Sequence, residues 1–304
     1  MSEQTRIICA VDLSRRSEGA FEYAVALAKS RRVQLELLFA VSPRHPFIWR
    51  ARERVAQLVK LRQRASAAQV DMTVTVQHGK PADVILQRAT SSHTGSPQLI
   101  VLGAPSRRGI ARISSPSVAQ AVVHDIDRPT LVVPGSEVAG SSVPVPFRRI
   151  LCAIDFSSAS MSALDEAVRL LKEGHGTMTL LHVVDVVHPA VPRMALEFPA
   201  FDHTTLLTEH AGRRLHSLLP VSEELDGRVH TQVAVGLTVD EIVRNAKDLK
   251  ADLVVLGVRK RGGLARLLGS TTGHALRRTE CPMLAVPAND NKWRADADLD
   301  AVAA

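Results

Sequence analysis

The sequence predicts an α/β protein made of two tandem units, each a doubly wound, five-stranded parallel sheet with helices on both faces. Three observations predict this fold. The 304-residue chain repeats its own motifs in the same order. Within each repeat, short β-branched runs alternate with longer helical patterns. The strand-like runs are apolar throughout, which is typical of parallel strands buried on both faces of a sheet.

The repeat appears in several motifs that recur at a nearly constant offset. RIICAVDLS at 6–14 returns as RILCAIDFS at 149–157, and QLIVLG at 98–103 returns as DLVVLG at 252–257. The motif RPTLVVP at 128–134 returns as CPMLAVP at 281–287, an offset of 153. The order is preserved throughout, so the chain is a tandem duplication of a unit of about 140 residues.

The repeat and the local composition set the domain boundaries. We expect a first domain over residues 1–135 and a second over 148–288. Between them, residues 136–147 are rich in Gly, Ser and Pro and are predicted to be a linker. Residues 289–304 are polar and acidic and are predicted to be a mobile tail.

The elements of the first unit follow from its alternating patterns. Its strands are predicted near 6–12, 33–40, 71–77, 98–102 and 129–133, and its helices near 16–31, 49–68, 81–94 and 114–126. The strands of the second unit are predicted near 148–154, 177–184, 228–235, 252–257 and 282–286. Cys9 and Cys152 occupy equivalent positions in the first strands and are predicted to be small buried residues.

Composition excludes several classes of protein. No apolar run approaches the roughly 20 residues of a membrane helix, and the N-terminus lacks the pattern of a signal peptide. Three cysteines do not make a disulfide framework. A cytoplasmic protein without membrane association is therefore expected.

The net charge of +7 is concentrated in the first unit. Residues 1–140 contain 19 Lys and Arg against 11 Asp and Glu, whereas residues 141–304 contain 19 against 20. Much of the excess falls in the predicted helix at 49–68, on Arg50, Arg54, Lys60, Arg62 and Arg64. This helix is either a solvated basic face or a surface for an acidic partner or nucleic acid. Aromatic residues make up only 3% of the chain, so nucleic-acid binding by base stacking is disfavoured.

Ligands of open doubly wound sheets bind beyond the carboxyl ends of the strands, where the strand order reverses. Two loops of each unit lie there. One follows the first strand and begins with Asp12 or Asp155. The other follows the fourth strand and begins with Gly103 or Gly257.

The ordered motifs together resemble the universal stress protein family. These motifs are AVD-x-S or AID-x-S, LLHVV, VGLTVDEIV, DLVVLG and CPMLAVP, and they cover nearly the whole chain twice. The resemblance implies a tandem member with Rossmann-like sheets in the strand order 3-2-1-4-5. It also implies that the two units pair through their last strands, which would cover an edge of unpaired backbone groups. Further association into a homodimer stays open.

Nucleotide-binding members of this family carry Gly-x2-Gly-x9-Gly-Ser/Thr after the fourth strand. The glycines let backbone N–H groups approach phosphates, and the following helix offers its N-terminus. The resemblance also implies an aspartate for the adenosine hydroxyls and an apolar residue against the base. In the second unit, the implied nucleotide-binding residues are Asp155, Val183, Leu256, Gly257, Lys260, Gly269, Ser270 and Thr271.

Both units depart from that pattern. In the second unit Lys260 replaces the second glycine, and eight residues instead of nine separate it from Gly269. A lysine hinders close backbone approach but brings an ammonium that can meet phosphate. In the first unit the implied residues are Asp12, Gly103 and Ser117, but Pro116 precedes the serine and has no N–H to offer. Asp12 has the alternative role of a turn acid at the strand end.

The function expected from the sequence is that of a stress-response regulatory protein that binds ATP, with Mg²⁺, in its second unit. The alternative is a stress-associated scaffold that binds other proteins and no nucleotide. No phosphate-binding loop of the Gly-x4-Gly-Lys-Ser/Thr type, nucleophile elbow or metal-ligand cluster is present in the sequence. We therefore expect no catalytic residues and no metal site of the protein's own, although slow ATP hydrolysis stays open. The protein partners are not indicated.

Overall fold

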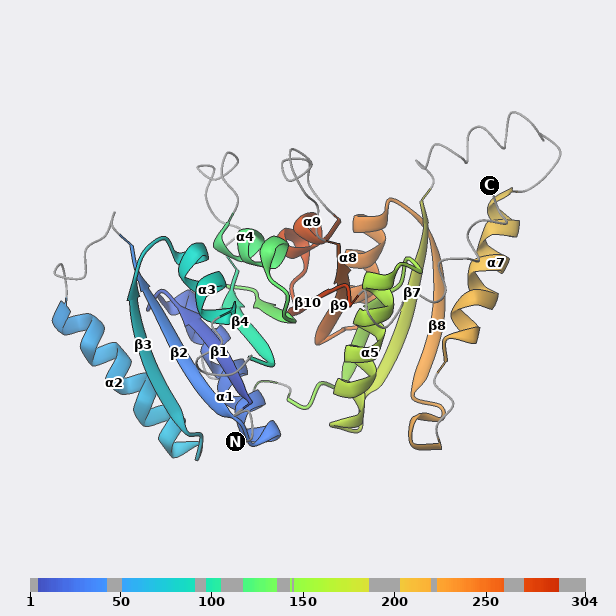
Figure 1. The fold of residues 1–304 in the computed structure, drawn as a ribbon. Coiled ribbons are helices and arrows are strands. Elements are labelled where there is room, and N and C mark those ends of the chain that lie inside the picture. Colours follow the sequence, from blue (N-terminus) through green and yellow to red (C-terminus); the bar gives the residue numbers. More distant parts are fainter. Residues whose placement is uncertain are drawn as a thin grey trace. The chain divides into compact units, whose positions relative to one another are not determined.

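The computed structural model describes residues 5–42, 51–90, 97–104, 117–135, 143, 145–185, 203–219, 223–259 and 271–289 (Figure 1). The chain divides into two compact units. Unit 1 comprises Met1–Val145 with Pro282–Ala285, and unit 2 comprises Pro146–Cys281 with Val286–Ala304. Most of the predicted linker and all but the first residue of the predicted tail lie outside the described residues.

Unit 1 is a parallel sheet with helices on both faces. Its elements are β1 (Arg6–Val11), α1 (Arg15–Arg31), β2 (Gln34–Val41), α2 (Ala51–Ala67), β3 (Met72–His78), α3 (Pro81–Thr90), β4 (Leu99–Gly103), α4 (Val118–Asp125) and β5 (Thr130–Val133). The strands lie in the order β3-β2-β1-β4-β5, and their mutual pairings are all parallel. Residues Met283–Ala285, which also belong to unit 1, run antiparallel to β5.

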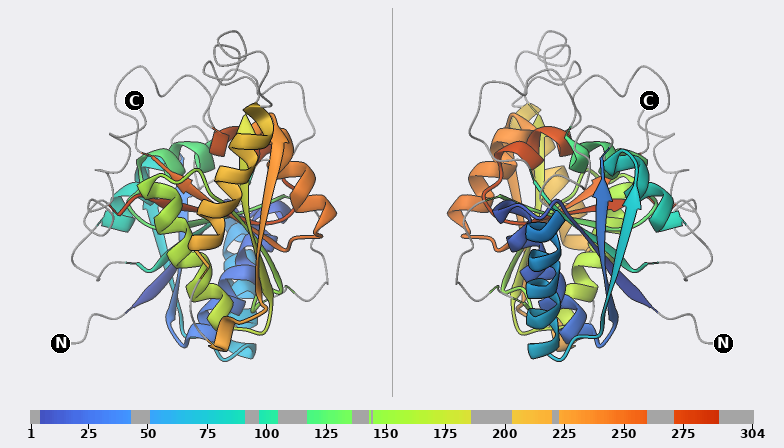
Figure 2. Two further views of the ribbon diagram at one scale, coloured as in Figure 1. Left: turned by 90° about the vertical axis from the view of Figure 1, so that its right-hand side faces the viewer. Right: turned by 90° about the vertical axis from the view of Figure 1, so that its left-hand side faces the viewer.

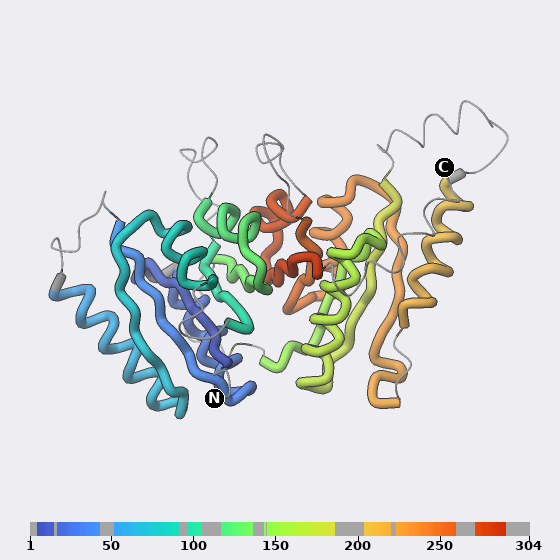
Figure 3. Tube along the Cα trace, in the orientation of Figure 1, coloured from blue at the N-terminus to red at the C-terminus, as the bar shows by residue number. Residues whose placement is uncertain are grey.

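Unit 2 repeats this arrangement (Figure 3). Its elements are β6 (Arg149–Ala153), α5 (Ser158–Lys172), β7 (Thr177–Asp185), α7 (His203–Ser217), the 3-10 helix η3 (Glu223–Leu225), β8 (Val229–Gly236), α8 (Thr238–Asp248), β9 (Leu253–Val258), α9 (Thr271–Arg278) and the end of β10 (Met283–Pro287), the strand whose first three residues are grouped with unit 1. The strand order is β10-β9-β6-β7-β8, and β6 pairs in parallel with both β7 and β9. Both units therefore have the predicted order 3-2-1-4-5, and the predicted strands are confirmed to within two residues at each end.

The two faces of unit 1 can be assigned from two residues of β2. Glu36 and Phe39 are an odd number of positions apart, so their side chains point to opposite faces. Glu36 accepts a hydrogen bond from Arg88 of α3, whereas the guanidinium of Arg54, on α2, lies 5.8 Å from the Phe39 ring centroid. Helices α2 and α3 therefore cover opposite faces of the sheet.

The core consists of the apolar strands and the helix faces that cover them. Cys9 and Cys152 are both fully buried and free, as expected for small core residues. Burial raises the pKa of the Cys152 thiol to about 12, so this thiol stays protonated at neutral pH. Among the described residues, no helix has both the length and the apolar character needed to cross a membrane.

The units differ where the third helix meets the sheet. In unit 1, the carboxylate of Glu36 is 2% exposed. Its oxygens lie 3.0 Å from Arg6 Nε, 2.5 Å from Arg88 Nε and 2.8 Å from Thr75 Oγ1. In unit 2 the helix α8 is joined to β8 by a neutral pair instead, since Gln232 Nε2 donates to Asn245 Oδ1. A buried ionic network in one unit thus corresponds to an amide pair in the other.

Candidate functional site

The candidate site of each unit begins at a turn between the first strand and the first helix. In unit 2, Oδ1 of Asp155 accepts hydrogen bonds from the backbone N–H and the hydroxyl of Ser157. Oδ1 of Asp12 accepts the same two bonds from Ser14 in unit 1. An aspartate that captures the N–H two residues ahead forms an Asx turn. The Asp-x-Ser motif therefore has a structural role in both units, which corresponds to the turn-acid alternative for Asp12.

The middle residue of each turn has a left-handed backbone. Leu13 has φ 59° and Phe156 has φ 60°. Residues with a Cβ adopt this conformation only at a cost, and large side chains do so rarely. The turn thus stores strain that its surroundings must offset.

In unit 2, the surroundings clamp the strained residue between two side chains. The ring of His182, on β7, lies 4.8 Å from the Phe156 ring, and the guanidinium of Arg214, on α7, lies 4.0 Å from that ring's centroid. The Nδ1 atom of His182 lies 2.8 Å from the carbonyl oxygen of Ile154, the last residue before the turn. Elements far apart in the sequence therefore hold the residues on both sides of Asp155.

The His182 imidazole is held in its neutral form. Burial lowers its pKa, and the nearby Arg214 charge adds to this effect. The Ile154 carbonyl and the Asp155 carboxylate act in the opposite sense without reversing the net shift. A neutral imidazole can stack on Phe156 without repelling Arg214.

The second oxygen of Asp155 meets a cation from the other loop. Arg259 Nη2 donates to Asp155 Oδ2 over 3.3 Å, and both side chains are more than half exposed. Burial by itself would raise the pKa of Asp155. The hydrogen bonds from Ser157 and the charge of Arg259 lower the pKa by more than burial raises it, so the net shift is downward. The site therefore presents an ionised carboxylate beside an exposed guanidinium.

The strand register brings these loops together. Ala153 of β6 lies opposite Leu181 of β7 on one side and Leu256 of β9 on the other. Because parallel strands end at the same edge of a sheet, the predicted residues that follow these positions meet there. They are Asp155, Val183 and Gly257.

Gly257 has a packing role that does not depend on a ligand. A Cβ at this position would lie 2.4 Å from the carbonyl carbon of Ala159 and 2.5 Å from the amide nitrogen of Ser160. Glycine therefore allows β9 to pass against the first turn of α5. Leu256 before it is 4% exposed, so its side chain belongs to the core.

The remaining predicted residues of unit 2 lie beyond the end of β9. Thr271 begins α9 and is exposed. Lys260, Gly269 and Ser270 lie outside the described residues. Phe156, His182 and Arg214 were not predicted as site residues. A large aromatic residue inside the Asp-x-Ser turn was the one signal in the sequence that could have indicated them.

The corresponding loop end in unit 1 is structural. Ser117 is the N-cap of α4: its hydroxyl accepts from the Gln120 N–H over 3.2 Å, and the Gln120 side chain accepts from the Ser117 N–H over 3.1 Å. This reciprocal capping box uses the groups that a phosphate would need. Gly103 ends β4 opposite Val133. Within the part of the chain that the structure describes, no group of three or more His, Cys, Asp or Glu side chains could hold a metal ion.

Comparisons with known proteins agree on one family. The family model described as the universal stress protein family matches residues 4–134 and again 146–287. A universal stress protein of Methanocaldococcus jannaschii is 32% identical over 145 residues, which cover 46% of this chain and 82% of the relative. One of Mycolicibacterium smegmatis is 24% identical over 302 residues, which cover 92% of this chain and 96% of the relative.

The fold is also shared with solved structures. A crystal structure of a universal stress protein from Archaeoglobus fulgidus superposes with a TM-score of 0.66 and 20% sequence identity. The superposition covers 95% of this chain and 100% of that chain. The similarity therefore extends over both units.

Proposed function

Because the chain belongs to the universal stress protein family, with two family domains in tandem, we propose that it is a stress-response regulatory protein that binds an adenine nucleotide in unit 2. ATP, accompanied by Mg²⁺, is the proposed ligand. Unit 1 is proposed to be a structural partner with no nucleotide of its own. The proposal assigns a binding role and no catalytic one.

The observation that carries this proposal is the pairing of Asp155 with Arg259 across two loops at one sheet edge. An ionised carboxylate can accept hydrogen bonds from ribose hydroxyls. A guanidinium beside it can meet phosphate oxygens through several donors. Since both side chains are more than half exposed, a ligand could displace their mutual contact at little cost.

The state of Asp155 also supports binding over catalysis. Its lowered pKa keeps the carboxylate ionised at neutral pH, and a weakly basic carboxylate is a poor general base. Its Oδ1 atom is already committed to Ser157. A bound nucleotide would thus act as a regulatory or stabilising occupant.

Two observations favour a second candidate, a scaffold that binds no nucleotide. The same Asx turn occurs in unit 1, where Pro116 interrupts the loop motif. Gly257 is required by its contact with α5 whether or not a phosphate binds. Under this candidate, the retained motif residues serve folding alone.

Calorimetric titration of nucleotide-stripped protein with ATP and Mg²⁺ separates the two candidates. Asp155→Asn keeps the Oδ1 acceptor of the turn and removes the charge, and Asp12→Asn is the matched control in unit 1. We expect binding in the micromolar range, about −8 kcal/mol, weakened at least tenfold by Asp155→Asn and unchanged by Asp12→Asn. The absence of heat and of thermal stabilisation at millimolar ATP would favour the scaffold.

A further inference from the structure

Helix α2 of unit 1 carries a stripe of exposed residues. The stripe consists of Arg52, Val55, Val59 and Arg62, which recur at intervals of three, four and three residues. Both valines are 49% exposed, and both arginines are exposed. This spacing places all four on one side of a helix, as at the seam between two packed helices.

The stripe lies on the flank of α2 that faces away from α1. The opposite flank is anchored by Arg64, which forms an ion pair with Glu22 of α1 and lies 5.6 Å from the Phe21 ring centroid. At 3.6 residues per turn, Val55 and Val59 lie about 180° and about 140° around the helix from Arg64. Figure 2 (right) looks onto unit 1 from the side of α2 and β3.

The edge strand β3 adds apolar surface on the same face of the sheet. Thr75 bonds to Glu36 and so points to the face covered by α3. Its neighbours Val74 and Val76 therefore point to the face covered by α2, and they are 36% and 47% exposed. The docking surface, as we define it, is made of Val55, Val59, Val74 and Val76 with the flanking Arg52 and Arg62.

The duplicated unit shows that the fold does not require these valines. The buried residues Leu61 and Ala65 of α2 correspond to Ala211 and Leu215 of α7, an offset of 150 residues. At the same offset, Val55 and Val59 correspond to Thr205 and Glu209. Unit 2 thus builds the same helix with polar residues where unit 1 exposes valines.

The charge of α2 indicates the occupant. Residues 51–67 contain five basic side chains and one acidic side chain, Glu53, which gives a net charge of +4. A twofold contact with a second copy of this surface would bring two such helices together and is opposed by repulsion. A nucleic-acid duplex would satisfy the arginines but leave the valines unburied. An amphipathic helix with apolar residues along one stripe and acidic residues beside it satisfies both.

We propose that α2 and β3 of unit 1 form a docking surface for an acidic amphipathic helix of a partner protein. This surface is separate from the candidate nucleotide site of unit 2. The valines provide the apolar contact, and Arg52 and Arg62 pair with the acidic flanks.

The test is a fluorescence-anisotropy titration of full-length protein. The probe is a labelled three-heptad helical peptide with leucines at the two seam positions of each heptad and glutamates beside them. A scrambled peptide of identical composition and charge is the reference. The variant V55Q/V59Q removes the apolar stripe and should keep the helix, because glutamine is a good helix former. L206Q on α7 is the control, because Leu206 is also 49% exposed.

We expect saturable binding that weakens with added salt and falls at least tenfold in V55Q/V59Q or with the scrambled peptide, while L206Q leaves it unchanged. Equal binding of both peptides, or no effect of V55Q/V59Q, would overturn the proposal. So would tighter binding of duplex DNA at the same site, or a wild-type dimer that V55Q/V59Q dissociates. Stronger peptide binding by D296N/D298N/D300N would instead assign the surface to the chain's own acidic C-terminus and would also overturn it.

Discussion

The guanidinium of Arg214 lies over the ring of Phe156, 4.0 Å from its centroid, at the residue whose left-handed backbone presents Asp155. The two residues belong to α7 and to the turn after β6, and all of α5 and β7 lies between them in the sequence. The position of α7 is therefore coupled to the geometry of the candidate nucleotide site through one cation–π contact.

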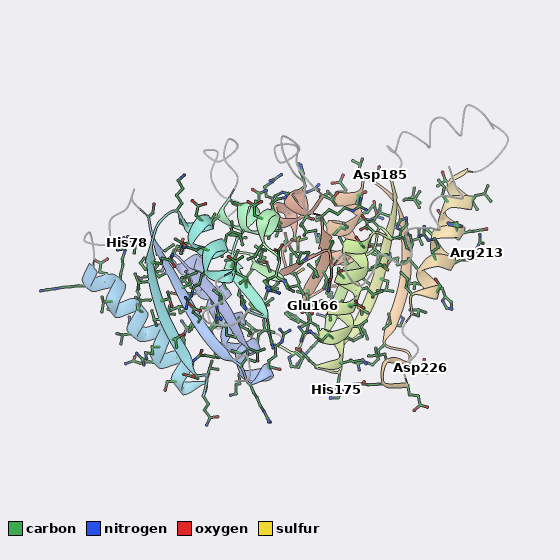
Figure 4. All side chains as sticks on the ribbon, in the orientation of Figure 1. His78, Glu166, His175, Asp185, Arg213 and Asp226 are labelled. Carbon is green, nitrogen blue, oxygen red and sulfur yellow. The ribbon has the colours of Figure 1, made fainter. Side chains whose placement is uncertain are left out.

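Replacement of Arg214 by methionine should lower the stability of unit 2. The change keeps much of the side-chain volume but removes the charge over Phe156, at an expected cost of about 1 kcal/mol. Arg213, also on α7 (Figure 4), provides the control Arg213→Met. Its side chain is 72% exposed, and its ion pair with Glu209 is long, at 3.8 Å. Hydrogen exchange of the α7 and β6 amides would show the difference. Equal exchange in the two variants would mean that the contact holds nothing in place.

Gly257→Ala should destabilise unit 2 with or without nucleotide. The added Cβ would overlap backbone atoms of Ala159 and Ser160, which cannot move aside as a flexible side chain can. Such overpacking costs about 1–3 kcal/mol. Gly212→Ala is the control, because nothing lies within 4 Å of a Cβ there and alanine favours a helix. Thermal unfolding would compare the two, and a neutral Gly257→Ala would contradict the packing role.

Glu36→Gln should selectively destabilise unit 1. The amide cannot balance the buried charge of Arg6, which is 3% exposed, or the partly buried charge of Arg88. Removal of one partner from a buried ion pair costs about 3 kcal/mol or more. Faster hydrogen exchange in β1, β2 and β3, with β6 and β7 unchanged, is the expected result. Glu209→Gln, in an exposed pair, should leave all strands unchanged.

The stability of unit 2 should fall as the pH falls below about 6.5. The pKa of His182 is lowered in the folded state, so the unfolded chain binds more protons in this range and stability rises with pH. The stability contributed by neutral His182 is complete above the unfolded pKa and is lost as the pH falls through the folded pKa.

His182→Phe should flatten this dependence. Phenylalanine occupies the equivalent position in unit 1, as Phe39, and cannot be protonated. The readout is the change in unfolding temperature between neutral and mildly acidic buffer, measured beside His216→Phe, a change at an exposed histidine. An unchanged slope in His182→Phe would assign the acid sensitivity to other groups.

The sequence by itself determined the elements, the duplication and the strand order. The periodicity of strands and helices is local, and Gly, Pro and the Asp-x-Ser motif indicate where these elements end. The bounds of β1 and β6 were therefore predicted close to those observed. The family motifs supplied the order 3-2-1-4-5. The turn role of Asp12 was also open to prediction, because its hydrogen bonds reach only two residues along the chain.

Only the tertiary structure decided what surrounds those motifs. Arg259 meets Asp155 across 104 residues of sequence, and Arg214 reaches Phe156 from a different helix. The need for glycine at position 257 depends on how closely β9 passes α5, and the exposure of Val55 and Val59 depends on which flank of α2 meets α1. Such contacts depend on how elements pack, and no local pattern of residue types encodes that distance or orientation.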